Sequence, residues 1–294
     1  MDAKGEITII PLSCFLCFFM KLISFDTLRT LHFPLHIQLK PDQIFKYKEQ
    51  LLDADWVLYP EYWQLNALLF AFKARIFPSV ATYMIGHNKV EMTRAFEAVV
   101  PANLPVTRIH GNTAEKAELL WDTFATPFVA KIPKSSMGEG VFLIESRRDW
   151  QAYCEKTDTL YVQEFLPIDR DLRLVVVGEK VVSAYWRLQS SNGFHNNVAR
   201  GGVVALGDIP PDAIVLVEYV AKTLGIDHAG FDVAMVDGFP YLLEFNRMFG
   251  TRGIDGKFIA RCVTEYLSDR MDYFDPEFPG FPSGRLPKKN RRVA

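Results

Sequence analysis

Residues 230–246 read Gly230-Phe-Asp-Val-Ala-Met-Val-Asp-Gly-Phe-Pro-Tyr-Leu-Leu-Glu-Phe-Asn246, two apolar runs separated by an Asp-Gly pair. An Asp-Gly pair between such runs is a strong short-range signal for a β-hairpin. We expect a three-residue loop, Asp237–Phe239. The register that follows from this loop places Asp232 opposite Glu244 on the neighbouring strand.

Three oxygen-donating side chains then share one face of the hairpin. Asn246 lies two residues after Glu244, on the same side of the strand, because side chains alternate along a strand. Two adjacent buried carboxylates repel unless a proton or a cation lies between them, and oxygen-only ligands suit Mg²⁺ or Mn²⁺ better than zinc. The apolar neighbours of Glu244 favour a metal site formed by Asp232, Glu244 and Asn246. Protonated or solvent-facing carboxylates are the alternative.

A second segment, residues 128–141, has a small polar loop between two β-rich flanks. Gly138 and Gly140 would let the backbone approach phosphate oxygens closely. Lys131 lies inside the first strand, where a buried ammonium needs an anion. The segment differs from a P-loop because the lysine precedes the glycines and no helix follows. A plain hairpin with a polar tip is the alternative interpretation.

Three arginines occur on the strands between this loop and the hairpin. Arg173 comes two residues after Asp171, Arg187 ends an apolar run, and Arg200 precedes a Gly-Gly pair. Each could be a surface charge. Their position between a phosphate-type loop and a metal-type hairpin predicts instead a clamp for anionic oxygens.

The whole chain has a globular composition that excludes extensive disorder. It has 294 residues, 49% hydrophobic, with a net charge of −2. Because five basic and no acidic side chains lie in residues 285–294, the rest of the chain is acidic, and we expect neither nucleic acid nor membrane as a partner. Four cysteines are too few for a disulfide framework, which indicates a reducing cytoplasm. The apolar stretch Ile7–Phe25 is interrupted by Pro11 and Lys21, which argues against a signal peptide or membrane helix.

The secondary-structure pattern changes along the chain. The first 80 residues alternate apolar runs with helical patterns, typical of a small α/β unit with a parallel sheet, and the chain from about residue 127 is strand-rich, typical of an α+β fold. In the first region we expect strands at Ile7–Ile10, Leu35–Leu39 and Trp56–Tyr59, and helices after the first strand and at Asp42–Leu52 and Gln64–Arg75.

The order of these motifs resembles the ATP-grasp superfamily and, within it, the RimK-type α-L-glutamate ligases, over roughly residues 81–255. The matching elements, in the order of the family, are Lys131, Gly138-x-Gly140, Gln163-Glu164-Phe165, Asp171-x-Arg173, Arg187, Asn197-x-x-Arg200, Asp232 and Glu244-x-Asn246. The resemblance implies a two-lobed ATP-grasp fold at 85–274, with a small lobe at about 126–166 and a large lobe at about 167–274. An α/β pre-ATP-grasp-like domain at 1–84 would precede it, and a flexible basic tail at 275–294 would follow.

The resemblance also implies a role for each matching residue. The residues that would hold ATP are Lys89, Lys131, the loop residues Ser135, Gly138 and Gly140, the adenine-side residues Glu164, Phe165 and Leu166, and Asp171 and Arg173. Two Mg²⁺ or Mn²⁺ ions would be bound by Asp232, Glu244 and Asn246. The residues that would stabilise charge during transfer are Arg200, Arg187 and Asn197.

The implied activity is an ATP-dependent ligase that joins a carboxylate to an amine through an acyl phosphate. Departures from the glutamate ligases at 194–200 and at 247–250 lie near the acceptor side, so glutamate itself is an open substrate. Two alternatives are an ATP-grasp kinase that phosphorylates a hydroxyl and a non-catalytic nucleotide- or peptide-binding module. The identity of the amine, whether free amino acid, peptide or protein terminus, and assembly into a homo-oligomer are also open.

Overall fold

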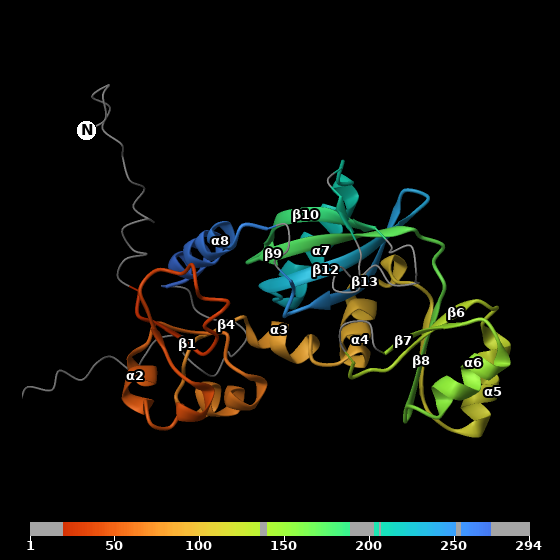
Figure 1. Ribbon diagram of the computed structural model, residues 1–294, viewed down its shortest axis with the longest axis horizontal. Coiled ribbons are helices and arrows are strands. Elements are labelled where there is room, and N and C mark those ends of the chain that lie inside the picture. The colour runs from red at the N-terminus through yellow and green to blue at the C-terminus, as the bar shows by residue number, and fades with distance from the viewer. Residues whose placement is uncertain (1–19, 136–139, 189–202, 206, 251–253, 272–294) are drawn as a thin grey trace, which may run out of the picture. The chain divides into compact units, whose positions relative to one another are not determined.

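The structure is a computed structural model that describes residues 20–135, 140–188, 203–205, 207–250 and 254–271. The chain divides into two compact units (Figure 1): unit 1 contains residues 1–80 and 254–294, and unit 2 contains residues 81–253. Several predictions lie outside the described residues, namely the strand Ile7–Ile10, the site residues Gly138, Asn197 and Arg200, and the tail 275–294.

Unit 1 contains the parallel sheet that the alternating pattern predicts. Its strand order is β2-β1-β3-β4, and every neighbouring pair is parallel. The strands are β1 (Leu22–Ser24), β2 (His36–Gln38), β3 (Trp56–Leu58) and β4 (Ile76–Phe77). Strand β1 lies where we expected a helix. Its three residues are buried, as a central strand with both faces covered requires.

Two expected helices of unit 1 are shorter than predicted. The pattern at Asp42–Leu52 forms the 3₁₀ turn η1 (Pro41–Gln43) and the helix α2 (Lys48–Asp53). The pattern at Gln64–Arg75 forms only the 3₁₀ turn η2 (Tyr62–Gln64) and the π-helical turn η3 (Ala67–Ala71). The second pattern ends early because the backbone N–H of Ala74 donates to the carbonyl of Leu68, and Lys73 has a positive φ of 51°.

Helix α8 (Gly256–Asp269) belongs to unit 1, although the sequence placed it in the second domain. The ring centroid of Tyr266 lies 6.2 Å from that of Phe77 on β4. Arg75 Nη1 donates to the carbonyl of Met271, just beyond the helix, at 2.7 Å. The apolar face of the helix is buried by these contacts, which a helical period alone does not reveal. Within the described part of the chain, no helix has the length and hydrophobicity needed to cross a membrane.

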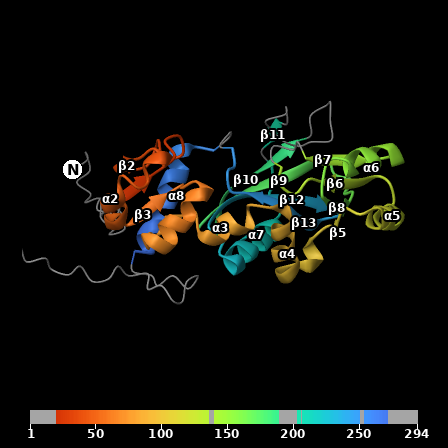
Figure 2. The ribbon, with the colours of Figure 1, turned by 90° about the horizontal axis from the view of Figure 1, so that it is seen from below.

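The first sheet of unit 2 is antiparallel, with the order β5-β8-β6-β7. Its strands are β5 (Thr107–Gly111), β6 (Phe128–Lys131), β7 (Val141–Ile144) and β8 (Thr159–Glu164), and Figure 2 shows α5 (Ala114–Thr123) and α6 (Arg147–Cys154) beside it. Phe128, Trp150 and Leu120 join the helices to the sheet in one apolar cluster. The predicted small lobe began near residue 126 and therefore omitted β5 and α5.

The second sheet of unit 2 has the order β11-β10-β9-β12-β13, all antiparallel. Its strands are β9 (Arg170–Val177), β10 (Lys180–Leu188), β11 (Val203–Ala205), β12 (His228–Val236) and β13 (Phe239–Asn246). The remaining helical elements of unit 2 are α3 (Val80–Ile85), α4 (Lys89–Val99), η4 (Pro101–Asn103) and α7 (Pro211–Leu224). The strand-rich pattern expected from about residue 127 is confirmed.

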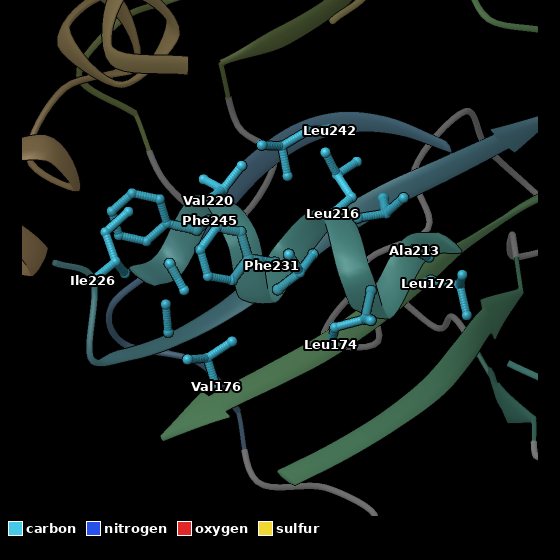
Figure 3. Close-up of a cluster of buried hydrophobic side chains, with 14 of the residues drawn as sticks. Leu172, Leu174, Val176, Ala213, Leu216, Val220, Ile226, Phe231, Leu242 and Phe245 are labelled. Carbon is cyan, nitrogen blue, oxygen red and sulfur yellow. The ribbon is translucent and has the colours of Figure 1, made fainter. Parts of the chain in front are cut away.

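Strand alternation gives the second sheet one apolar and one polar face. Leu172, Leu174 and Phe231 point to the apolar side and pack with α7 and α4 in a single buried cluster (Figure 3). The residues between them, Arg173 and Asp232 among others, therefore point to the opposite side. The fold thus places the charged residues of three strands on one surface.

The hairpin formed by residues 230–246 has a different loop from the one predicted. Val236 pairs with Phe239, so the turn has two residues, and both of them, Asp237 and Gly238, have positive φ (50° and 81°). This is the geometry that Asp-Gly favours in tight hairpins. A β-bulge between Asp232 and Val233 on one strand shifts the register by one residue and restores the pairing of Asp232 with Glu244. The predicted loop length is wrong, and the predicted pairing is confirmed.

The apolar core can be tested with two valines of the same helix. Val217 on α7 is 0% exposed, whereas Val215 is 66% exposed. We expect Val217→Ala to lower the free energy of unfolding by about 2 kcal/mol, because two methyl groups are lost and a cavity remains. Val215→Ala should change it by less than about 0.5 kcal/mol. Equal losses in urea titrations of the two variants would contradict the placement of α7.

Candidate functional site

The polar face of the second sheet carries a row of charged side chains across three adjacent strands. Arg173 on β9 pairs in register with Asp232 on β12, and Asp232 pairs with Glu244 on β13. Arg187 on β10 pairs with Asp171 on β9, two residues further along the same face. The sequence-predicted residues of the hairpin and of the strands before it are therefore brought together.

Two arginines hold Asp232 and Asp171 in one buried network. Arg187 donates to both oxygens of Asp171 at 2.7 Å, and its Nη2 also lies 3.0 Å from Asp232 Oδ2. Arg173 Nε lies 2.7 Å from Asp232 Oδ1, and its Nη2 donates to Oδ2 at 3.3 Å. All four side chains are less than 10% exposed. Removal of one member of such a pair would destabilise the protein, because it would leave a buried charge without a counter-charge.

Burial and pairing oppose each other in the pKa values of this network. Burial raises the pKa of Asp171, and Arg187 only partly offsets this effect. Burial would lower the pKa of Arg187, but the charges of Asp232 and Asp171 outweigh it and raise that pKa. Arg187 is therefore a permanent cation with a fixed orientation. Asp171, predicted to hold ATP, has both oxygens bonded to Arg187, and its contact with ATP stays a prediction.

Glu244 is a half-buried carboxylate in the field of two lysines. Burial would raise its pKa, but Lys89 and Lys131 outweigh it and lower the pKa below the ordinary value. The amide Nδ2 of Asn246 donates to Glu244 Oε1 at 3.2 Å, which adds to the same effect and confirms that the two side chains share a face. Glu244 is thus an anion at neutral pH in spite of its burial.

Lys131 ends β6 and is the buried ammonium that the sequence indicated. It is 7% exposed, and its Nζ lies 5.6 Å from the ring centroid of Tyr161. Burial lowers the pKa of Lys131 from 10.5 to about 8, against the opposing charge of Glu244. An additional anion nearby would stabilise the charged form of this buried lysine. Tyr161 pairs with Lys131 in the sheet and was not predicted as part of the site, because only the β6–β8 register reveals it.

The Lys131 pKa makes a testable difference to stability. Between pH 8 and 10.5 the unfolded chain holds a proton on Lys131 that the folded chain has lost, so folding becomes more favourable as the pH rises. From pH 8 to pH 10.5, we expect the free energy of unfolding of the wild type to rise by up to about 3 kcal/mol relative to that of Lys131→Met. Urea titrations at pH 7.5, 9 and 10.5 measure the difference. A difference that is the same at all three pH values would contradict the burial of a charged Lys131.

Lys89 connects the start of α4 to the base of the glycine-containing loop. Its Nζ donates to the carbonyl of Ser135 at 2.6 Å, and Ser135 Oγ donates to the carbonyl of Ile132 at 2.8 Å. A Cβ at Gly140 would lie 2.1 Å from Ser135 Oγ, so the loop closes this tightly only with glycine at 140. Both ends of the loop predicted to bind phosphate are thus held beside Lys89.

The predicted adenine-side residues lie at the end of β8. Glu164 Oε1 accepts a hydrogen bond from the backbone N–H of Val106 at 2.7 Å, and the carbonyl of Leu166 accepts one from Ile168. Phe165 lies between them in the chain, half-buried. The Glu164 carboxylate therefore joins β8 to the segment before β5. Adenine binding by these three residues stays a prediction.

Asp232, Glu244 and Asn246 supply the kind of oxygen atoms that a divalent cation prefers. Arginine and lysine side chains, however, already neutralise the two carboxylates. Asp232 Oδ1 is buried and has no hydrogen bond of good geometry, despite the nearby Arg173. Among the described residues, no three His, Cys, Asp or Glu side chains are arranged to hold a metal ion. Asp232 and Glu244 are neutralised by arginine and lysine side chains, whereas the sequence argument expected a proton or a metal. These counter-charges were missed because they come from other strands and from α4, and the sequence pattern does not show which cations face Asp232 and Glu244.

Comparison with known proteins identifies a family and relatives. A family model described as RimK-like ATP-grasp domain matches residues 88–263. The chain is 30% identical over 179 residues to a probable alpha-L-glutamate ligase of Azotobacter vinelandii, covering 58% of this chain and 60% of that protein. It is 31% identical over 159 residues to a ribosomal protein bS6--L-glutamate ligase of Salmonella paratyphi B, covering 52% and 53%. The chain thus spans less than two thirds of the length of either relative.

A solved structure has the same fold at low sequence identity. It is the D-alanine--D-alanine ligase from Bacillus anthracis complexed with ATP, with a TM-score of 0.63, 14% identity, and coverage of 86% of this chain and 98% of that one. The two antiparallel sheets of unit 2 correspond to the two lobes of an ATP-grasp fold, which confirms the predicted fold class. The family match covers more than half of the 294 residues, and this chain therefore belongs to the RimK-like ATP-grasp family.

Proposed function

We propose that the chain is an ATP- and Mg²⁺-dependent ligase that joins a carboxylate to an amine. The observation that carries the proposal is the charge arrangement around Glu244, a half-buried anion that lies near Lys89 and Lys131 and is paired in the sheet with Asp232. Cations held without solvent are what a site needs to bring several anionic oxygens together. Membership of an ATP-grasp family supports a nucleoside triphosphate as the source of those oxygens.

The lysines and arginines of the site would bind and orient the phosphates. Lys131, whose charged form is disfavoured by burial, would be stabilised as a cation beside a phosphate oxygen. Lys89 would exchange its bond to the Ser135 carbonyl for a phosphate contact, which couples nucleotide binding to the loop. Arg187, held in place by Asp171, presents a fixed cation toward the same face. Arg200 and Asn197 stay predicted participants in transfer.

Asp232, Glu244 and Asn246 would hold divalent cations, because their oxygens lie on one face and Glu244 is ionised. Bound Mg²⁺ would neutralise the phosphate oxygens and so lower the electrostatic barrier to an approaching carboxylate. The proposed reaction requires no covalent nucleophile from the protein.

The proposed reaction has two steps. A substrate carboxylate oxygen attacks the γ-phosphorus of ATP, the bond to the β–γ bridging oxygen breaks, and ADP leaves. The amine then attacks the carbonyl carbon of the acyl phosphate, the carbon–oxygen bond breaks, phosphate leaves, and the amine proton is released to solvent. The names of the two relatives favour an amino acid as one substrate and a protein or peptide as the other.

ATP turnover with a panel of acids and amines tests the proposal. We expect ADP, phosphate and an amide in equal amounts, and formation of all three only when both substrates are present. A stable phosphorylated product without free phosphate would contradict the ligase and support the kinase. Nucleotide binding without turnover across amino acids and peptides of varied charge would support the non-catalytic module instead.

A further inference from the structure

The network around Asp232 carries an inference about the order in which ligands bind, and it rests on the proposed function. We propose that Arg173 and Arg187 occupy Asp232 in the ligand-free protein, so that Asp232 becomes a metal ligand only after a nucleotide draws the arginines onto its phosphates. Glu244 and Asn246 would be available to a cation with or without nucleotide, whereas Asp232 would be available only after a nucleotide has bound.

Both oxygens of Asp232 lie close to arginine nitrogens, although only Oδ2 accepts a hydrogen bond of good geometry. Its Oδ1 lies 2.7 Å from Arg173 Nε, and its Oδ2 lies within 3.3 Å of the terminal nitrogens of both arginines. Glu244 differs, because among the described residues its one side-chain hydrogen bond comes from the neutral Asn246 amide, and its cations act at longer range. Asp232 and Glu244, which face each other across β12 and β13, therefore differ in their contacts: two arginines lie against Asp232, whereas Glu244 is bonded to a neutral amide.

The charge balance explains why a metal alone would not release Asp232. The buried carboxylates Asp171 and Asp232 and the half-buried Glu244 lie among Arg173, Arg187, Lys131 and the nearby Lys89. This group already has four cations for three carboxylates, so an entering divalent cation adds uncompensated positive charge in a region of low dielectric. A nucleotide polyphosphate adds negative charge, which offers the arginines new partners and leaves Asp232 to the cation.

The position of Arg173 is defined by packing as well as by charge. A Cβ at Gly230 would lie 2.5 Å from Arg173 Nη1 and 2.9 Å from Phe249 Cβ. The guanidinium therefore lies against the bare backbone of β12, two residues before Asp232. Glycine at this position allows Arg173 to approach Asp232 closely in the ligand-free protein.

Mn²⁺ binding to the full chain, measured by electron paramagnetic resonance with and without ADP, tests the inference. Without ADP, we expect Asp232→Asn to bind Mn²⁺ with the wild-type dissociation constant, within about twofold. With ADP, the same variant should bind Mn²⁺ about tenfold or more weakly than the wild type, as loss of a metal ligand requires. A tenfold weakening already present without ADP would overturn the proposal, and so would an unchanged constant with ADP.

Removal of an arginine gives the complementary result. Arg173→Met frees one side of Asp232, and we expect Mn²⁺ to bind about tenfold more tightly without ADP. Arg170→Met is the matched control, because Arg170 starts the same strand, is 52% exposed and pairs with Asp169. An unchanged Mn²⁺ constant in Arg173→Met with a wild-type urea midpoint would contradict the inference. If Arg173→Met fails to fold, the Asp232→Asn comparison decides alone. Failure of ADP to bind the wild type would refute the proposed function instead.

Discussion

Glu244→Gln is expected to lower Mg²⁺-dependent ATP turnover by about 10²- to 10³-fold and to leave the protein folded. The substitution keeps the size and the hydrogen-bonding capacity of the side chain but removes its charge. Glu244 is ionised in the folded protein because Lys89 and Lys131 lower its pKa against the effect of burial. The neutral amide would lose the attraction for a divalent cation and would leave two lysines without their shared counter-charge.

Three measurements separate this effect from general damage. Steady-state ADP release measures turnover, and circular dichroism with a urea midpoint reports the fold. Glu115→Gln is the matched control: Glu115 lies on α5 with its side chain 83% exposed and pairs only with Lys116 among the described residues. Turnover in Glu244→Gln above half that of the wild type would contradict the metal role of Glu244.

Lys131→Met should weaken ADP binding by about a hundredfold, the second large effect. Methionine fills the same buried space, so the loss reports the charge rather than a cavity. The folded protein without nucleotide holds Lys131 at a cost, which the lowering of its pKa to about 8 measures. A phosphate oxygen would recover that cost on binding. The variant should therefore bind nucleotide poorly while remaining stable.

Isothermal titration with ADP at pH 7 measures the affinity. Lys180→Met is the control, because Lys180 Nζ is solvent-exposed and bonds to Glu218 at 3.0 Å on the surface of β10. A fall of less than about threefold in Lys131→Met would show that the phosphates bind elsewhere. A loss of equal size in Lys180→Met would attribute the effect to overall charge.

Much of the site could be predicted from the sequence because it lies on strands. Asp232 and Glu244 face each other because two alternating runs meet at an Asp-Gly turn, and this pairing follows from side-chain period and register. The pairing was predicted with the wrong loop length. A two-residue turn and one bulge have the same net register as a three-residue turn, and local sequence does not distinguish them well.

The partners of the charged side chains could not be predicted in the same way. Asp171 was expected to hold ATP, and its cross-strand contact with Arg187 was not foreseen. Asp232 was expected to need a metal, but Arg173 already lies beside it. These contacts join residues on different strands, and their distances depend on strand order, which the sequence pattern alone does not establish.

Helix α8 shows the same limit at the level of domains. Its apolar period predicts a helix correctly, but the helix packs on β4 of unit 1, nearly 180 residues earlier in the chain. The amphipathic face specifies that the helix must be covered and leaves open which surface covers it. The same holds for β5, which joins the first sheet of unit 2 although it precedes the predicted small lobe.

The central claim is that the polar face of β9, β12 and β13, together with Lys89 and Lys131, forms one nucleotide–metal site. A crystal structure with ADP and Mn²⁺, with the metal located by its anomalous signal, tests it most directly. The account predicts Mn²⁺ coordinated by Glu244 and Asn246, with Asp232 turned from Arg173 toward the metal, and the β-phosphate beside Lys131. Mn²⁺ and the phosphates bound away from these side chains would contradict the account.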